Sequence, residues 1–246
     1  MANHYQRPPI VEAVIEFQLA SSLSPQDLKT LRSYLLDQFP TEEEISTFSF
    51  HLDFDTGRAT VKTDALGFKL TSIDGSAVRV IRNAALAFSS VGLYGGWENF
   101  SGSVRHDMDE YVRQVKRKIA ISRVGVRYIN RIDIPYAAGG KYETGDYVTY
   151  NLQTPASMGS TTQVAIQARH SIGEADHCEV IVNSTTAPSP LINHSSIIVD
   201  LDIVKIGDVP APGDQLWELV QRMRGYKNDV FEAAITDKTR ELIGSD

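Results

Sequence analysis

The sequence predicts an α+β protein with a large, mainly antiparallel β-sheet and about three main helices packed on it. Predicted strands outnumber helices, most strands are joined to their sequence neighbours by short turns, and helices occur between groups of strands. The chain has 246 residues, a length at which mixed folds often form one unit, and no repeat or linker divides it. We therefore expect a single domain over 1–246, with two possible sub-lobes at 1–135 and 136–246.

The first forty residues contain a strand and a helix. Apolar and polar residues alternate over 8–20, which is the pattern of a strand with one buried face, and two prolines suit its start because proline donates no ladder hydrogen bond. Ser24 followed by Pro25 has the features of a helix N-cap, and an apolar stripe at helical spacing continues up to Pro40.

The rest of the chain adds two groups of strands and the other helices. Short strands joined by turns such as DTGR and DGS are predicted over 48–54, 59–63, 67–73, 77–83 and 85–94. A helix over 97–120, a strand over 123–135 and a long loop over 136–160 come next. Three strands (161–170, 177–183 and 195–206) and two helices (213–235 and 236–243) complete the chain.

Composition excludes several classes of protein. A net charge of −7 argues against a general affinity for nucleic acid or for an anionic membrane, and no run of 18 apolar residues occurs. The single cysteine, Cys178, excludes an intramolecular disulfide and a cysteine-only metal site. With no secretory leader at the start, we expect a soluble, cytoplasmic protein without nucleic-acid or membrane partners.

Three arginines mark the strand over 123–135. Arg123, Arg127 and Arg131 are four residues apart and share one face, so either carboxylates hold them or they bind an anion. Glu12 and Glu16 have the same spacing on the first strand. If the two strands are neighbours, these glutamates can form ion pairs with Arg127 and Arg131, each worth about 0.2–1 kcal/mol.

The alternative uses the same arginines as ligands. Most predicted strands carry one polar face, which is typical of a sheet with one face in water. If the strands instead curl around a polar cavity, the arginines could bind phosphate oxygens while Asp53, Asp200 or Asp202 hold a divalent metal.

No motif assigns a metal, a cofactor or a catalytic residue. His51 with Asp53, Asp200 with Asp202, and the run over 176–179 place possible ligands close in sequence. No His-x-x-x-His, Cys-x-x-Cys, calcium-loop or G-x-S-x-G pattern supports them, so we interpret these residues as solvated strand faces and predict no metal site.

Two further features bear on packing. Asn130 lies among apolar residues of its strand, so it needs buried partners, and we expect it to anchor a loop or a helix end. The helix over 213–235 carries a long apolar stripe. The stripe either packs into the core or, in part, forms a self-complementary dimer interface.

Three stretches carry a family resemblance: YQRPPIVEAVIEFQL (5–19), VGVRYINRIDIP (124–135) and VFEAAITDKTRELIG (230–244). Together they resemble a sporadically distributed, uncharacterised family of prokaryotic proteins of about this length, and R-Y-I-N-R-I is the most specific part. The resemblance implies a soluble bacterial or archaeal protein. It brings no activity, cofactor or catalytic residue.

These observations favour a non-enzymatic protein that binds a protein partner or a small ligand, and that forms a homo-oligomer such as a dimer. The alternative is an enzyme or sensor for an anionic or phosphorylated small molecule, bound in a polar β-lined cavity by Arg123, Arg127 and Arg131.

Overall fold

A computed structural model describes residues 5–53, 58–135, 142–152, 157 and 163–244. Within these residues it contains nine strands in one antiparallel sheet and four helices, which confirms the predicted fold class. The strands are β1 (Ile10–Leu19), β2 (Thr41–Asp53), β3 (Arg58–Thr71), β4 (Ala77–Arg82), β5 (Ala85–Val91), β6 (Ile121–Pro135), β7 (Ala165–Ile172), β8 (Cys178–Pro188) and β9 (His194–Ile206). The helices are α1 (Pro25–Leu35), α2 (Trp97–Val115), α3 (Asp214–Ala234) and α4 (Asp237–Ile243).

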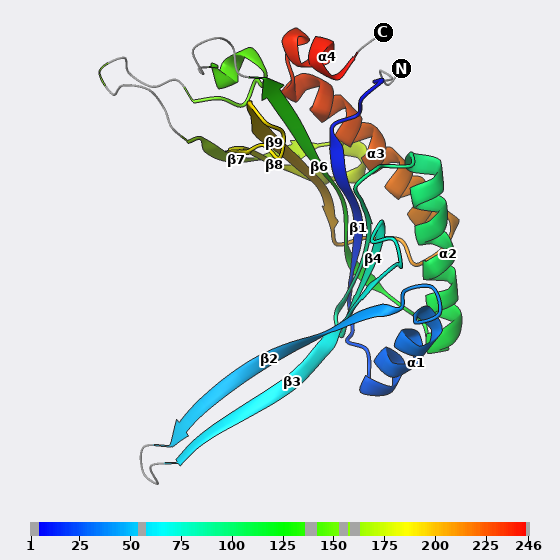
Figure 1. Ribbon diagram of the computed structural model, residues 1–246. Helices are drawn as coiled ribbons and strands as arrows, with labels where there is room; N and C mark the ends of the chain where they lie inside the picture. The colour runs from blue at the N-terminus through cyan, green and yellow to red at the C-terminus, as the bar shows by residue number, and fades with distance from the viewer. Residues whose placement is uncertain (1–4, 54–57, 136–141, 153–156, 158–162, 245–246) are drawn as a thin grey trace.

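The strand order is β2-β3-β4-β5-β1-β6-β9-β8-β7, with β2 and β7 at the two edges. The first strand in the sequence therefore lies at the centre, between β5 and β6. The sheet is strongly curved, and the helices lie on one side of it (Figure 1). The opposite face carries no helix of the described chain, and we call it the helix-free face.

The β2–β3 hairpin is longer than the sequence suggested. Two separate strands were expected over 59–63 and 67–73, but β3 runs without a break because its pairing with β2 continues through a bulge. The backbones of β3 and β4 lie close together at Gly67, since a Cβ on this residue would lie 1.9 Å from the Ile81 carbonyl oxygen. Most of the expected DTGR turn lies outside the described residues, because 54–57 are not described.

Helix α2 ends earlier than the expected 97–120. Lys116 adopts a left-handed conformation (φ 52°, ψ 28°), which stops the helix after Val115. The chain then turns toward β6 and buries Ile119 outside the helix. Ile119 fits the apolar period of the helix, so the period alone could not locate its end.

The predicted start of α1 is confirmed. The Ser24 hydroxyl accepts a hydrogen bond from the Asp27 backbone N–H at 3.1 Å, and the Asp27 carboxylate accepts one from the Ser24 N–H at 2.9 Å. This reciprocal pair is a capping box, and Pro25 occupies the first helical position.

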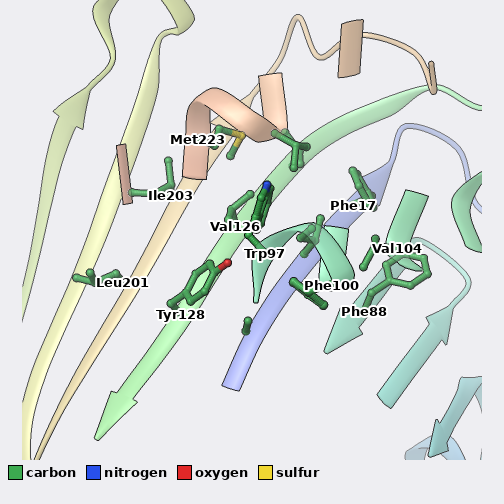
Figure 2. Close-up of a cluster of buried hydrophobic side chains, with 14 of the residues drawn as sticks. Phe17, Phe88, Trp97, Phe100, Val104, Val126, Tyr128, Leu201, Ile203 and Met223 are labelled. Carbon is green, nitrogen blue, oxygen red and sulfur yellow. The ribbon is translucent and has the colours of Figure 1, made fainter. Parts of the chain in front are cut away.

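The core lies between the sheet and the helices, where side chains from β1, β5, β6, β9, α2 and α3 meet (Figure 2). Phe17 of β1 packs edge to face against Phe88 and Trp217, with ring centroids 6.1 Å apart in both pairs. The apolar stripe of α3 is part of this core, because Leu216 and Met223 are fully buried. Most of the stripe therefore packs into the core, Val230 stays partly exposed, and the expected homo-oligomer stays a prediction.

None of the described helices is both long enough and apolar enough to span a lipid bilayer.

Candidate binding site on the helix-free face

Strand β6 lies between β1 and β9, so its side chains have neighbours on two sides. The alternate residues Val124, Val126 and Tyr128 are buried under the helices. The arginines at 123, 127 and 131 belong to the other set of side chains, which faces away from the helices. The structure therefore places all three on the helix-free face, as the alternation predicted.

Arg127 is held by β9. Its Nε and Nη2 donate to the two carboxylate oxygens of Asp200 at 2.8 and 2.7 Å, and Asn183 of β8 donates to the same carboxylate at 3.1 Å. The hydrogen bond with Asp200 raises the pKa of the Arg127 guanidinium. Because Asp200 is only 7% exposed, Arg127 neutralises a buried charge and stabilises the fold.

Arg123 bridges two strands. It donates to Glu16 of β1 at 2.9 Å and to Asp202 of β9 at 3.0 Å. Burial raises the pKa of the Asp202 carboxyl, although Arg123 and Arg127 act in the opposite direction. Gly125 leaves room for this bridge, because a Cβ there would lie 3.1 Å from an Asp202 oxygen and 3.2 Å from an Arg123 nitrogen.

The ion pairs expected between the glutamates of β1 and Arg127 or Arg131 are wrong. Strands β1 and β6 are neighbours, but the register places Val14, not Glu16, opposite Arg127. Glu16 therefore reaches Arg123 instead, and Glu12 forms no ion pair with any described residue. The register is two residues from the expected one, and a β-bulge interrupts it near the start of β1.

Asn130 is buried as expected, at 2% exposure. Its Nδ2 donates to the Val199 carbonyl oxygen at 3.0 Å. The residue therefore joins β6 to β9, and the expectation that it anchors a loop or a helix end is wrong.

Arg131 differs from the other two arginines. Its Nε donates to Asp133 of the same strand at 3.1 Å, while its two terminal nitrogens form no hydrogen bond with any described residue. Asp133 also accepts hydrogen bonds from Ser189 at 2.8 Å and Ser196 at 2.6 Å. Burial would raise the pKa of the Asp133 carboxyl, but the bonds from Ser196, Ser189 and Arg131 outweigh it and lower the pKa. Asp133 thus stays ionised and fixes Arg131 by one side of its guanidinium.

Arg131 lines a cleft of about 710 Å³, which we call the β6-end cleft. Its walls come from the start of β1, the ends of β5, β6 and α4, and the connection between β8 and β9, so it lies at the end of the sheet, where the helix-free face meets α4. The start of the chain is tied to α4 here, since the Arg7 N–H donates to the Ile243 carbonyl oxygen at 3.0 Å (Figure 1). The Arg7 side chain is exposed, lines the same cleft and has no ion pair with the described residues.

The β6-end cleft also has a histidine and an apolar rim. His194 donates from Nδ1 to the Ile192 carbonyl oxygen at 2.8 Å, and its Nε2 has no hydrogen-bond partner among the described residues. Leu93, 100% exposed, and Leu191, 50% exposed, line the cleft, and Ile192, 87% exposed, follows Leu191 in the same connection. Exposed apolar side chains therefore stand on two connections beside the cationic residues of the cleft.

Possible metal ligands do not gather in the described residues, where no group of three His, Cys, Asp or Glu side chains could hold an ion. Asp200 and Asp202 are bound by arginines. The side chains of His51 and Asp53 lie outside the described part. Asp176 accepts from Arg222 and Tyr226 of α3, at 2.7–2.9 Å, and so ties the β7–β8 connection to that helix.

Sequence reasoning identified Arg131 but missed Arg7 and His194. Arg7 and His194 come to the same cleft as Arg131 only through contacts between segments that are far apart in the chain. One local signal was available: Leu191 and Ile192 stand between two predicted strands, where a connection is usually polar.

Comparison with models of known protein families gave no match, and comparison with curated protein sequences gave none either. The family resemblance described above therefore stays a prediction.

Proposed function

We propose that this chain is a non-enzymatic binding protein, and that its β6-end cleft holds a partner or ligand through an anionic group. One observation carries the proposal. Arg131 is fixed by Asp133 on one side, has two terminal nitrogens without a described partner, and lines a cleft of about 710 Å³ together with Arg7. A guanidinium fixed in this way binds carboxylate or phosphate oxygens with two parallel hydrogen bonds.

The alternative, an enzyme or sensor that binds a phosphorylated compound with all three arginines, has less support. Arg123 and Arg127 already donate to Glu16, Asp200 and Asp202. An anion that takes the bonds of Arg127 Nε and Nη2, or of the two terminal nitrogens of Arg123, would have to displace a carboxylate that is largely buried. Of the three arginines, only Arg131 has both terminal nitrogens without a partner among the described residues, so we place the ligand at the end of β6.

Native mass spectrometry of the protein purified from its own cells tests the proposal. We expect the wild type to retain a ligand or partner that Arg131→Gln loses. Arg169→Gln is the matched control, because Arg169 is an exposed arginine on β7, outside the cleft, paired with the exposed Glu179. Equal retention by the wild type and Arg131→Gln, or bare chains in both, contradicts the proposal.

A further inference from the structure

We propose, on the basis of the function above, that the occupant of the β6-end cleft is an acidic peptide segment of a partner protein, in which carboxylates stand next to apolar side chains. Three properties of the cleft lead to this ligand class: its charge, its size and its apolar rim.

The charge of the cleft suits carboxylates. Among the described residues that line the cleft, Arg7 and Arg131 are cationic and Asp133 is the one anionic residue, so this part of the wall carries a net positive charge. The chain as a whole carries −7, so this cationic site lies on an acidic molecule. An acidic segment is therefore attracted here and repelled by most other surfaces. Two arginines are too few for a nucleic acid or an anionic membrane, which need a larger basic patch.

The size of the cleft exceeds what a simple anion fills. Ligand pockets of roughly 300–1,000 Å³ hold drug-sized molecules, and the cleft, at about 710 Å³, lies within this range. Much of its wall is apolar, including Ile10, Val91 and Leu242. The occupant therefore brings apolar groups together with its anionic group.

The rim favours a polypeptide over a small molecule. Leu93 follows β5 and Ile192 lies in the β8–β9 connection, and both are almost fully exposed. A compound contained in the cleft would contact Leu93, which lines it, but would leave Ile192 in water. An extended segment that continues past the cleft would cover both side chains, and burying this apolar surface favours binding.

Selection from a phage-displayed library of random dodecapeptides on the immobilised full chain tests this inference. We expect enriched peptides with Asp or Glu next to Leu, Ile, Val or Phe. In fluorescence anisotropy, Arg131→Gln should weaken these peptides at least tenfold, and Leu93→Ser several-fold. Arg169→Gln should leave their affinity unchanged. Leu93 is fully exposed, so its replacement is compatible with folding.

No enrichment of acidic peptides, or equal binding to Arg131→Gln, overturns the inference. Thermal shifts with inorganic phosphate and with octanoate separate this result from failure of the proposed function. If either small anion raises the Tm of the wild type but not of Arg131→Gln, the function stands and the peptide inference fails. If neither anion raises the Tm and no peptide binds, the proposed function and the peptide inference both fail. A wild-type dimer that Arg131→Gln dissociates, seen by analytical ultracentrifugation, would make a second copy the occupant and also overturn the inference.

Discussion

Arg127 and Arg131 lie four residues apart on the same face of the same strand, yet the structure uses them differently. Arg127 lies in the middle of the sheet, where Asp200 holds it with two hydrogen bonds and Asn183 supports that carboxylate. Arg131 lies near the end of β6, and its carboxylate partner is Asp133 of its own strand. Two arginines on the same strand face thus have different roles: Arg127 forms a structural ion pair, and Arg131 keeps terminal nitrogens without a described partner.

The difference comes from what the neighbouring strands offer. Opposite Arg131, β9 presents Ile198, while the Arg131 backbone N–H donates to the Pro9 carbonyl oxygen at 2.8 Å. Neither neighbouring strand therefore places a carboxylate directly beside Arg131. The partners of an arginine are thus decided by strand order and register, and its place on the strand face does not determine them.

The largest expected effect is that of Arg127→Ala. The substitution leaves Asp200 charged and buried, with Asn183 as its remaining side-chain donor, so we expect a loss of about 2–3 kcal/mol in the free energy of unfolding. Urea denaturation measures it. Arg169→Ala, which removes an exposed pair with Glu179, should cost less than about 0.5 kcal/mol. Similar losses for the two variants would mean that the Arg127 pair is no more structural than a surface pair.

Lys227, on the helix-covered side of the sheet, is a buried cation that contrasts with the carboxylate-paired Arg127. It is buried, and its Nζ lies 4.1 Å from the centre of the Tyr128 ring, without an ion pair in the described residues. Burial, assisted by Arg224, lowers its pKa from 10.5 to about 8. A shift of this size costs about 3 kcal/mol at pH 7, and the contact with the ring recovers part of it. We expect Lys227→Met to stabilise the protein by about 1–2 kcal/mol at pH 7.

The sign of the pH dependence follows from the lowered pKa. Below pH 8 Lys227 is charged in the folded and the unfolded protein, so the cost of burying its charge is fully present. Between pH 8 and 10.5 only the unfolded protein keeps the proton on Lys227, so the free energy of unfolding rises with pH. The advantage of Lys227→Met should therefore shrink as the pH rises from 8 to 10. Cys178, whose pKa burial raises to about 11, acts in the opposite direction in both proteins and cancels in the comparison. A constant difference across this range would contradict the account.

Glu16→Gln tests the observed register and has a smaller effect. It removes one of the two carboxylates that hold Arg123, so we expect a loss of about 0.5–1 kcal/mol in chemical denaturation. Glu12→Gln is the matched control on the same strand and should change stability by less than about 0.3 kcal/mol. A larger loss for Glu12→Gln would favour the register that the sequence first suggested.

Arg131→Gln should have the smallest effect on stability. Asp133 keeps its hydrogen bonds from Ser189 and Ser196, so the loss should stay below about 0.5 kcal/mol. Urea denaturation checks this value. The same substitution should nevertheless abolish binding in the cleft. A variant that is strongly destabilised would show that Arg131 is a structural residue.

Much of the fold could be predicted because each element carries a local pattern. Alternation located β1, β6 and β9, and the Ser24 cap located the start of α1. The end of α2 and the unbroken β3 were missed, because a left-handed residue and a bulge leave no mark in apolar periodicity.

The site could be predicted only in part. The three arginines and their shared face follow from spacing along one strand. Their partners and the cleft depend on which strand lies beside β6, on a bulge near the start of β1, and on the approach of α4 to the start of the chain. These are contacts between segments far apart in the sequence, which no local pattern encodes.

Two double-mutant cycles, measured by urea denaturation, test whether Arg127 and Arg131 contribute differently to the stability of the fold. One cycle joins Arg127 with Asp200, and the other joins Arg131 with Asp133. The account predicts a coupling energy above about 1.5 kcal/mol for the first pair and below about 0.5 kcal/mol for the second. Equal coupling in the two cycles would contradict it, since Arg131 would then be as firmly committed to the fold as Arg127.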